Sequence, residues 1–234
     1  MSQAQQRWVR MTAALAARQG SAPTPAGLCV AFAEILAATS ASIVLMAENG
    51  TPGATYTSSE LAAKLEELQF TLGVGPGPDA FRRGVPIIES DLVARPPPAW
   101  IGFNGLAVED GTRAVFAFPL QVGAARIGTL TLYRDSPAPL EDDIYADALV
   151  MADIATLAFL AMQVRVPDGA LPDELSDDGA YGAEIHQASG MVSVQLDINV
   201  GEALLRLRAR AVADSTSLAQ LAAAVISREI RFHK

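Results

Sequence analysis

The stretch Arg113–Asp135, RAVFAFPLQVGAARIGTLTLYRD, is the strongest indication of a β-sheet in this chain. It holds two apolar runs, RAVFAFPLQV and ARIGTLTLYRD, which meet near Gly123. Runs of this length and composition predict two strands joined by a turn. Apolar residues fall on both faces of each run, as in strands of a sheet that is covered on each side.

The segments around this pair predict further strands and helices. Two more strands are expected at ASIVLMAE (41–48) and VPIIES (85–90), with a turn at NGTPGA (49–54) and a hairpin continuation at TYTSS (55–59). Helices are expected over residues 4–19, 25–38, 60–70, 79–83 and 140–163, and RPPPAWIGFN (95–104) is expected to be a stiff loop. Strands in the middle with helices at both ends predict an α+β fold, with a sheet flanked by helices.

An acidic, proline-containing stretch separates this body from the C-terminal tail. VPDGALPDELSDDGA (166–180) contains two prolines and five acidic residues, a composition typical of a linker or an exposed connection. We therefore predict a body over residues 1–165, an acidic linker over 166–180 and a second unit over 181–234.

The tail has the pattern of three short helices. Asn199 with Glu202 and Ser217 with Gln220 form two predicted capping boxes at the starts of the second and third helices. Apolar residues follow at helical spacing; the predicted faces are Ile185, Ala188, Val192 and Leu196, then Val200, Leu204, Leu207 and Ala211, then Leu218, Leu221, Val225, Ile226 and Ile230. Helices this short are marginal alone, so we expect the three to pack on one another as a small all-α domain.

Composition and charge set limits on the class of protein. Half of the 234 residues are hydrophobic, which supports a real core, and the formal net charge is -9. Residues 1–183 carry 21 acidic and 11 basic side chains, whereas residues 184–234 carry 5 and 6. The asymmetry fits two units with different tasks, and it fits equally an ordinary amphipathic tail. No apolar run looks long enough to span a bilayer, no signal peptide is evident, and we expect a cytoplasmic location without a membrane partner.

Few residues suggest catalysis or metal binding. The single cysteine, Cys29, lies in an apolar run and is expected in the core, and His186 and His233 fall in different predicted helices, so no metal site is expected. The glycine-rich GVGPGP (73–78) lacks the lysine of a phosphate-binding loop and is expected to be a shaped loop. The acidic residues of the 140–163 helix are interpreted as a solvated face: Asp142, Asp143, Asp147 and Asp153. We therefore expect no enzymatic activity.

The arginines of the tail are the main candidates for binding. On a helix, Arg206 and Arg210 point away from the apolar stripe and Arg208 lies at its flank. Guanidinium groups in such places bind phosphates or stack on unpaired bases, although a solvated helical face has the same pattern.

The tail and the body resemble two known families. Ile185–Phe232 resembles the ANTAR domain, a three-helix RNA-binding module of bacterial antiterminators: Ala188, Gly190 and Met191 match its A-x-G-M opening, Ala203, Leu207, Arg208 and Ala211 match its second helix, and Ala222, Val225 and Ile226 match its third. The body resembles a GAF sensor domain in LGVGPGPDAFRRGVPIIESDL (72–92) and in the 113–135 stretch.

The resemblance implies a GAF–ANTAR transcription antiterminator. Such a protein would be a homodimer that recognises stem-loops in nascent RNA, with no DNA target, no cofactor and an unknown small ligand in the GAF domain. Arg208 follows from the family motif as the first RNA-binding candidate, Arg206 and Arg210 from helix geometry, and Gln195 and Ser193 from their polar places on the first helix. The structural core of the RNA-binding domain would be Ala188, Gly190, Met191, Ala203, Leu207 and Ala211, with Ala188 and Gly190 permitting close helix packing. The alternative is a ligand-binding or dimerisation signalling module whose C-terminal helices pack rather than bind RNA.

Overall fold

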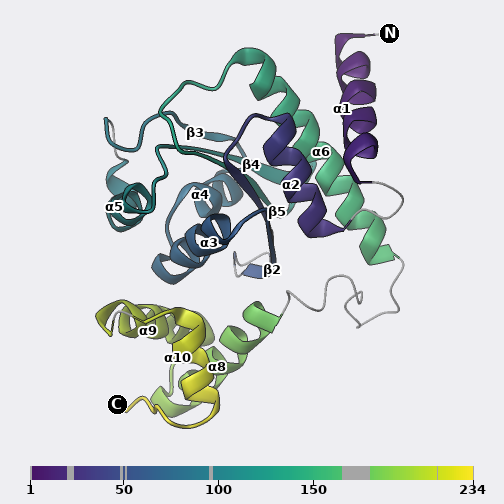
Figure 1. The fold of residues 1–234 in the computed structure, drawn as a ribbon. Helices are drawn as coiled ribbons and strands as arrows, with labels where there is room; N and C mark the ends of the chain where they lie inside the picture. Colours follow the sequence, from purple (N-terminus) through teal and green to yellow (C-terminus); the bar gives the residue numbers. More distant parts are fainter. Residues whose placement is uncertain are drawn as a thin grey trace.

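The body is built on a five-stranded antiparallel sheet of order β2-β1-β5-β4-β3 (Figure 1). The computed structural model describes residues 2–19, 24–47, 50, 52–94, 97–164, 180–214 and 216–233. The strands are β1 (Ser40–Met46), β2 (Pro52–Thr57), β3 (Ile87–Glu89), β4 (Ala114–Val122) and β5 (Ala125–Arg134). The hairpin predicted from the 113–135 stretch is the β4–β5 ladder, which runs from Ala114 opposite Arg134 to Val122 opposite Ala125. The expected α+β class is confirmed.

One face of the sheet carries the main apolar core. It is covered by α2 (Pro25–Ile35) and α6 (Asp142–Val164), and α1 (Gln3–Gln19) packs on these two helices. Alternate strand residues point into this layer and are fully buried: Ala41, Ile43, Phe116, Phe118, Leu130 and Leu132. Cys29 lies in the same core with none of its surface exposed, as expected, and burial raises the pKa of Cys29 to about 12.

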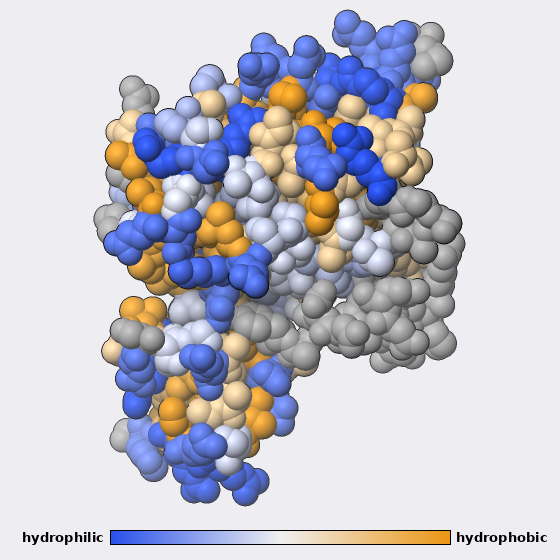
Figure 2. Space-filling view, viewed as in Figure 1, coloured by the Kyte–Doolittle hydropathy of each residue, from blue (hydrophilic) through white to orange (hydrophobic). Residues whose placement is uncertain are grey.

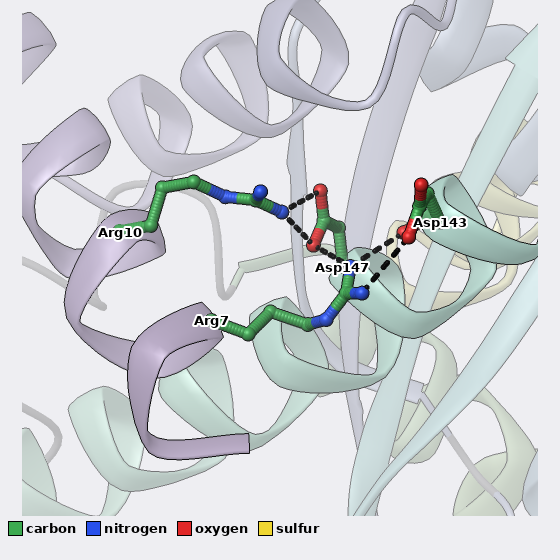
Figure 3. A network of polar contacts seen from close by, with 4 residues as sticks. All are labelled: Arg7, Arg10, Asp143 and Asp147. Carbon is green, nitrogen blue, oxygen red and sulfur yellow. Dashed lines mark hydrogen bonds and ion pairs between the residues drawn. The ribbon is translucent and has the colours of Figure 1, made fainter. Parts of the chain in front are cut away.

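An ion-pair network fastens α1 to the start of α6 (Figure 3). Asp147 accepts from Arg7 and, through both carboxylate oxygens at 2.7 and 2.8 Å, from Arg10 Nη2. Arg7 also donates to Asp143 Oδ1 at 3.0 Å. Asp147 is only 7% exposed, so the prediction of a solvated face is wrong for this residue, because two arginines from another helix cover it.

Helix α6 also corrects the expectation about membrane-spanning length. Its residues Asp142–Met162 are long and apolar enough to cross a bilayer by length and composition, the one such helix in the described part of the chain. The helix packs instead as a core element here, because Ala148, Met151, Ala155 and Phe159 are fully buried against the sheet.

The other face of the sheet is covered by α3 (Glu60–Leu72), α4 (Pro76–Arg83) and α5 (Ile101–Glu109), with a short 3₁₀ turn at Pro98–Trp100. The predicted loop 95–104 is wrong in its second half, where α5 begins. Two glycines lower the helix propensity of this segment, and packing overrides that preference. Trp100, Phe103 and Ala107 are buried in one cluster with α3 and the sheet, which supplies the stabilisation that local sequence lacks.

The C-terminal unit is the expected bundle of short helices: α8 (Ala180–Leu196), α9 (Val200–Ala213) and α10 (Leu218–Ile226). The Ser217–Gln220 capping box is complete, whereas at Asn199 only the bond from the Glu202 amide to the Asn199 side chain, 2.9 Å, is present between these two described residues. The three helices bury a common core that includes Ile185, Val192, Leu218 and Val225. The predicted linker lies outside the described residues except for Ala180, where α8 begins.

Candidate functional site

A buried polar network lies between the sheet and α3. Successive residues of a strand point to opposite faces, so Ser42 of β1 and Tyr133 of β5 face α3 while their neighbours enter the apolar core. Both hydroxyl groups donate to Glu66 Oε1 at 2.5 Å, and Gln69 Nε2 donates to Glu66 Oε2 at 3.0 Å. Burial raises the pKa of Glu66, and the hydrogen bonds from Ser42 and Tyr133 act in the opposite direction. Glu66 is therefore held as a buried, hydrogen-bonded carboxyl group.

Gln69 connects this network to the glycine-rich loop between α3 and α4. Its Oε1 accepts from the amide of Gly77 at 2.8 Å, and its Nε2 also donates to Tyr133. Gly75 must be glycine, because its φ is 145° and an added Cβ would lie 2.5 Å from Gln69 Oε1. The short loop is thus shaped around a glutamine side chain, which agrees with the prediction for residues 73–75; residues 76–78 form instead the first turn of α4, so the predicted loop is wrong there.

A cavity of about 620 Å³ opens beside this network. Its walls come from β1 and β2, from α3 and α4, and from α9 of the C-terminal bundle; apolar lining is supplied by Val44, Met46, Pro52, Phe70, Pro78 and Phe81, and charged lining by Glu60, Lys64, Glu66, Glu67, Arg82 and Arg208. The β1–β2 pairing shifts register between Val44 and Met46, so the ladder is interrupted where the two strands line the cavity. The volume suits a metabolite-sized molecule.

Arg208 joins the bundle to the body at the rim of this cavity. Its Nε donates to the carbonyl oxygen of Phe70 at 3.0 Å, and its guanidinium carbon lies 5.3 Å from the centre of the Phe70 ring. The contact places a cation on a carbonyl of the last turn of α3, where the helix dipole favours positive charge. Burial lowers the pKa of Arg208. In the part of the chain that the structure describes, no carboxylate forms an ion pair with Arg208.

The apolar core of the bundle extends into the body through Phe70. This side chain is 5% exposed and belongs to the same cluster as Leu207 and Leu218. Gly73, which ends α3 in the left-handed conformation, lies under Arg208, because an added Cβ would be 2.9 Å from Nη1. The two units therefore share both an apolar and a cationic contact at the C-terminal end of α3.

The other predicted RNA-binding residues have different surroundings. Arg206 and Arg210 are exposed on α9; Arg206 lies 3.9 Å from Glu202, and Arg210 pairs with Asp214 at 2.5 Å. On α8, Ser193 donates to the Ile198 carbonyl at 2.5 Å and Gln195 accepts from the Phe232 amide at 2.8 Å. Both polar side chains of α8 thus tie neighbouring segments of the bundle together, whereas the two exposed arginines face solvent. The structure does not gather the five residues into one surface, since Arg208 is turned to the body.

The predicted core residues of the bundle are mostly interior. Ala188, Ala203, Leu207 and Ala211 are fully buried, and Met191 packs partly buried against them. Gly190 is the exception, because an added Cβ would meet no atom of the described residues within 4 Å, apart from the backbone of its own helix and its chain neighbours. The expectation that Gly190 permits close helix packing is therefore wrong in this arrangement.

Polar and apolar residues alternate over the visible face of both units, without a single large patch of either kind (Figure 2). Within the described residues, no cluster of three or more histidine, cysteine or acidic side chains could hold a metal ion. His186 is exposed. The cavity and its rim are therefore the feature around which a function can be argued.

Comparison with solved structures identifies the fold of the body. The GAF domain of a phosphoenolpyruvate-protein phosphotransferase from Coxiella burnetii matches 70% of this chain and 98% of its own, with 18% identity and a TM-score of 0.51. The corresponding GAF domain from Acinetobacter matches 72% of this chain and 99% of its own, with 11% identity and a TM-score of 0.50. No family model and no curated protein matches the chain. The body thus has the fold of a GAF domain, and nothing in these likenesses supports the ANTAR resemblance of the tail.

Proposed function

We propose that this chain is a ligand-controlled signalling protein that acts by binding rather than by catalysis. Its GAF-type body binds a small molecule in the cavity. The C-terminal bundle docks at the rim of the cavity, and the strength of this docking depends on whether the cavity is occupied. The observation that carries the proposal is Arg208, a residue of the bundle that both lines the cavity and bonds to Phe70 of the body.

The coupling follows from linkage. A ligand that contacts residues of both units has a different affinity for the docked and the undocked state, and it shifts the equilibrium between them by that difference. A ligand confined to one unit, far from the joint, would have no such difference. The shared wall at Phe70, Gly73 and Arg208 supplies the physical connection.

Small-angle X-ray scattering tests the docking. Phe70→Ala should increase the radius of gyration, because it removes the apolar and the aromatic contact of the joint. Leu68→Ala is the matched control, since Leu68 lies on the same helix but packs against the α5 cluster. A panel of metabolites is then added to the wild-type protein, and at least one compound should change both the melting temperature and the radius of gyration. Equal dimensions for Phe70→Ala and wild type, or a panel without any effect, would refute the proposal.

We propose RNA stem-loops in nascent transcripts as the target of the bundle, with antitermination as the outcome. This candidate is supported by the three-helix architecture, by the ANTAR-like residues and by the exposed Arg206 and Arg210. Fluorescence anisotropy with a labelled hairpin RNA at two salt concentrations is the test. Arg206→Glu should weaken binding, and Phe70→Ala should strengthen it by freeing Arg208. Equal affinities for a scrambled single-stranded RNA and for the hairpin would contradict this role. The proposal of ligand sensing would not be affected by that result.

We further propose that the protein is a cytoplasmic homodimer without DNA or membrane partners. The N-terminal helix already pairs with α6 within one chain, yet Val9, Leu149 and Leu157 of these helices remain 55%, 39% and 53% exposed. Burial of such side chains favours association of a second copy along this helix layer. Light scattering should give the mass of two chains at micromolar concentration, and a strict monomer would exclude the dimer.

A further inference from the structure

The cavity proposed as the effector site is lined by cations from three different helices. Lys64 belongs to α3, Arg82 to α4 and Arg208 to α9. Lys64 pairs with Asp110 at 2.5 Å and Arg82 with Asp79, so each has an acidic partner outside the cavity. Arg208 instead contacts the neutral carbonyl of Phe70 and the face of its ring, and among the described residues no carboxylate pairs with it.

The acidic partner on α4 is shared. Asp79 is 4% exposed and contacts Arg82 and also Arg83, 3.6 Å away, and it accepts from Trp100 Nε1 at 3.1 Å. One carboxylate cannot fully neutralise two guanidinium groups, so Asp79 neutralises Arg82 only in part. The lining thus contains three cations and three carboxylates, and Arg208 is the cation without a carboxylate partner among the described residues.

The acidic side chains of the lining all come from α3. Glu66 is held inside the polar network by hydrogen bonds from Ser42 and Tyr133, and Glu60 and Glu67 lie on the α3 wall. Hydrogen-bond acceptors on that wall suit a ligand with donor groups along one side. The apolar residues Val44, Phe70 and Phe81 suit a carbon skeleton.

We propose that the cavity binds a small organic anion, a carboxylate or a phosphate ester, whose negative group pairs with the guanidinium of Arg208. The pairing supplies the counter-charge that the guanidinium lacks in the described part of the chain, and a partly buried guanidinium forms strong charge-assisted bonds with such groups. Carboxylates and phosphate esters share this chemistry, and the experiment below separates them. This inference rests on the proposed ligand-controlled function.

Because Arg208 belongs to the bundle, the anion contacts both units at once. Anion binding therefore tightens docking, and docking tightens anion binding by the same factor. Coupling between two sites is typically roughly 5- to 150-fold in affinity. The bound ligand stabilises the docked state of the bundle, so removal of the ligand favours release of the bundle.

The test is isothermal titration of the full chain with a panel of small carboxylates and phosphate esters, each paired with its neutral amide or alcohol. At least one acid should bind while its neutral partner binds at least about tenfold more weakly, and the arm that contains the binder identifies carboxylate or phosphate. Arg208→Gln should lower the affinity for the acid by at least about tenfold, and Arg208→Lys should restore part of the lost affinity. Arg210→Gln, on the exposed side of the same helix, should bind as wild type does. Thermal unfolding of each variant shows whether the body remains folded.

Arg82→Gln is a second variant, which leaves the contact between Arg208 and Phe70 intact. It should lower the affinity for the acid less than Arg208→Gln does. If no acid binds, or if acids bind Arg208→Gln as tightly as wild type, the anion proposal is overturned. Neutral compounds that bind and change the radius of gyration would overturn it while the proposed function survives. Acids that bind through Arg208 and leave the radius of gyration unchanged would instead overturn the coupling between cavity and bundle.

Discussion

Replacing Glu66 by glutamine should change how the stability of the protein depends on pH. Burial raises the pKa of Glu66 in the folded protein, whereas in the unfolded chain a glutamate titrates near about 4.3. Between these two values the folded state keeps a proton that the unfolded state has lost. The wild-type free energy of unfolding therefore falls as the pH rises from about 4.3 through the folded pKa, and the stability that this group contributes is fully present only at lower pH.

The size of the effect follows from a single proton. The slope from one group reaches at most about 1.4 kcal/mol per pH unit within that window. Glutamine cannot titrate, yet its amide can donate to the hydroxyls of Ser42 and Tyr133 and its oxygen can accept from Gln69, so the network retains its partners. Glu66→Gln should thus flatten the profile, and the variant should gain stability relative to wild type as the pH rises.

Urea unfolding at a series of pH values from 4 to 8 measures both profiles. Glu60→Gln, at an exposed position in the first turn of the same helix, controls for the change in net charge. Glu66→Ala should lose more than about 2 kcal/mol at every pH, because it leaves buried donors without an acceptor. Profiles for Glu66→Gln and wild type that run parallel over the whole range would refute the reasoning, since the raised pKa would then have no consequence for stability.

The remaining predictions concern stability and reactivity. Asp147→Asn should lower the free energy of unfolding by about 1–3 kcal/mol, since two arginines lose a charged acceptor; a loss under about 0.5 kcal/mol in urea would contradict a structural role. Gly75→Ala should lose more than about 1 kcal/mol because its Cβ displaces Gln69, whereas Gly190→Ala in open space should gain about 0.5–1 kcal/mol, and equal effects in thermal unfolding would disprove the distinction. Cys29 should react with a thiol reagent at pH 8 only after unfolding, because burial raises the pKa of Cys29 to about 12 in the native state; rapid labelling of the folded protein would be inconsistent with it.

The parts of the fold that depend on local sequence could be predicted. The β4–β5 hairpin, the cap residues Asn199 and Ser217 and the buried spacing of α8 follow from rules that operate within a few residues. Helix α5 could not be predicted, because its glycines oppose a helix and its stabilisation comes from packing against α3 and the sheet. The exposure of Asp142 and Asp143 at the start of α6 could be predicted from the sequence. The burial of Asp147 could not be predicted, since it depends on arginines more than a hundred positions away.

The candidate site shows the same division more sharply. The sequence indicated Arg208 as a candidate binding residue, and helix geometry placed it at the flank of the apolar stripe, where a side chain is partly buried. Its partner Phe70 is 138 positions away and gives no sign in the sequence of belonging to the core of another unit. The Glu66–Gln69 network was likewise missed, although an acid and an amide three residues apart on one helix, with hydroxyl residues in the strands, are a pattern that sheet topology could have assembled.

Arg208 also connects the two proposals about function physically. Its Nε donates to Phe70, and its guanidinium carbon lies 5.3 Å from the centre of the aromatic ring, so the side of the group that contacts Phe70 cannot contact an RNA base while the bundle is docked. If the tail binds RNA through this guanidinium, docking and RNA binding compete for it, and the free energy of docking is subtracted from the affinity for RNA. The body, residues 1–165, carries 16 acidic and 11 basic side chains, so its net negative charge adds electrostatic repulsion when the bundle is docked on it. An anion in the cavity would strengthen the docked state and so lower RNA affinity in the wild type but not in Phe70→Ala. A ligand effect of equal size in both proteins would show that the joint at Phe70 does not carry the signal.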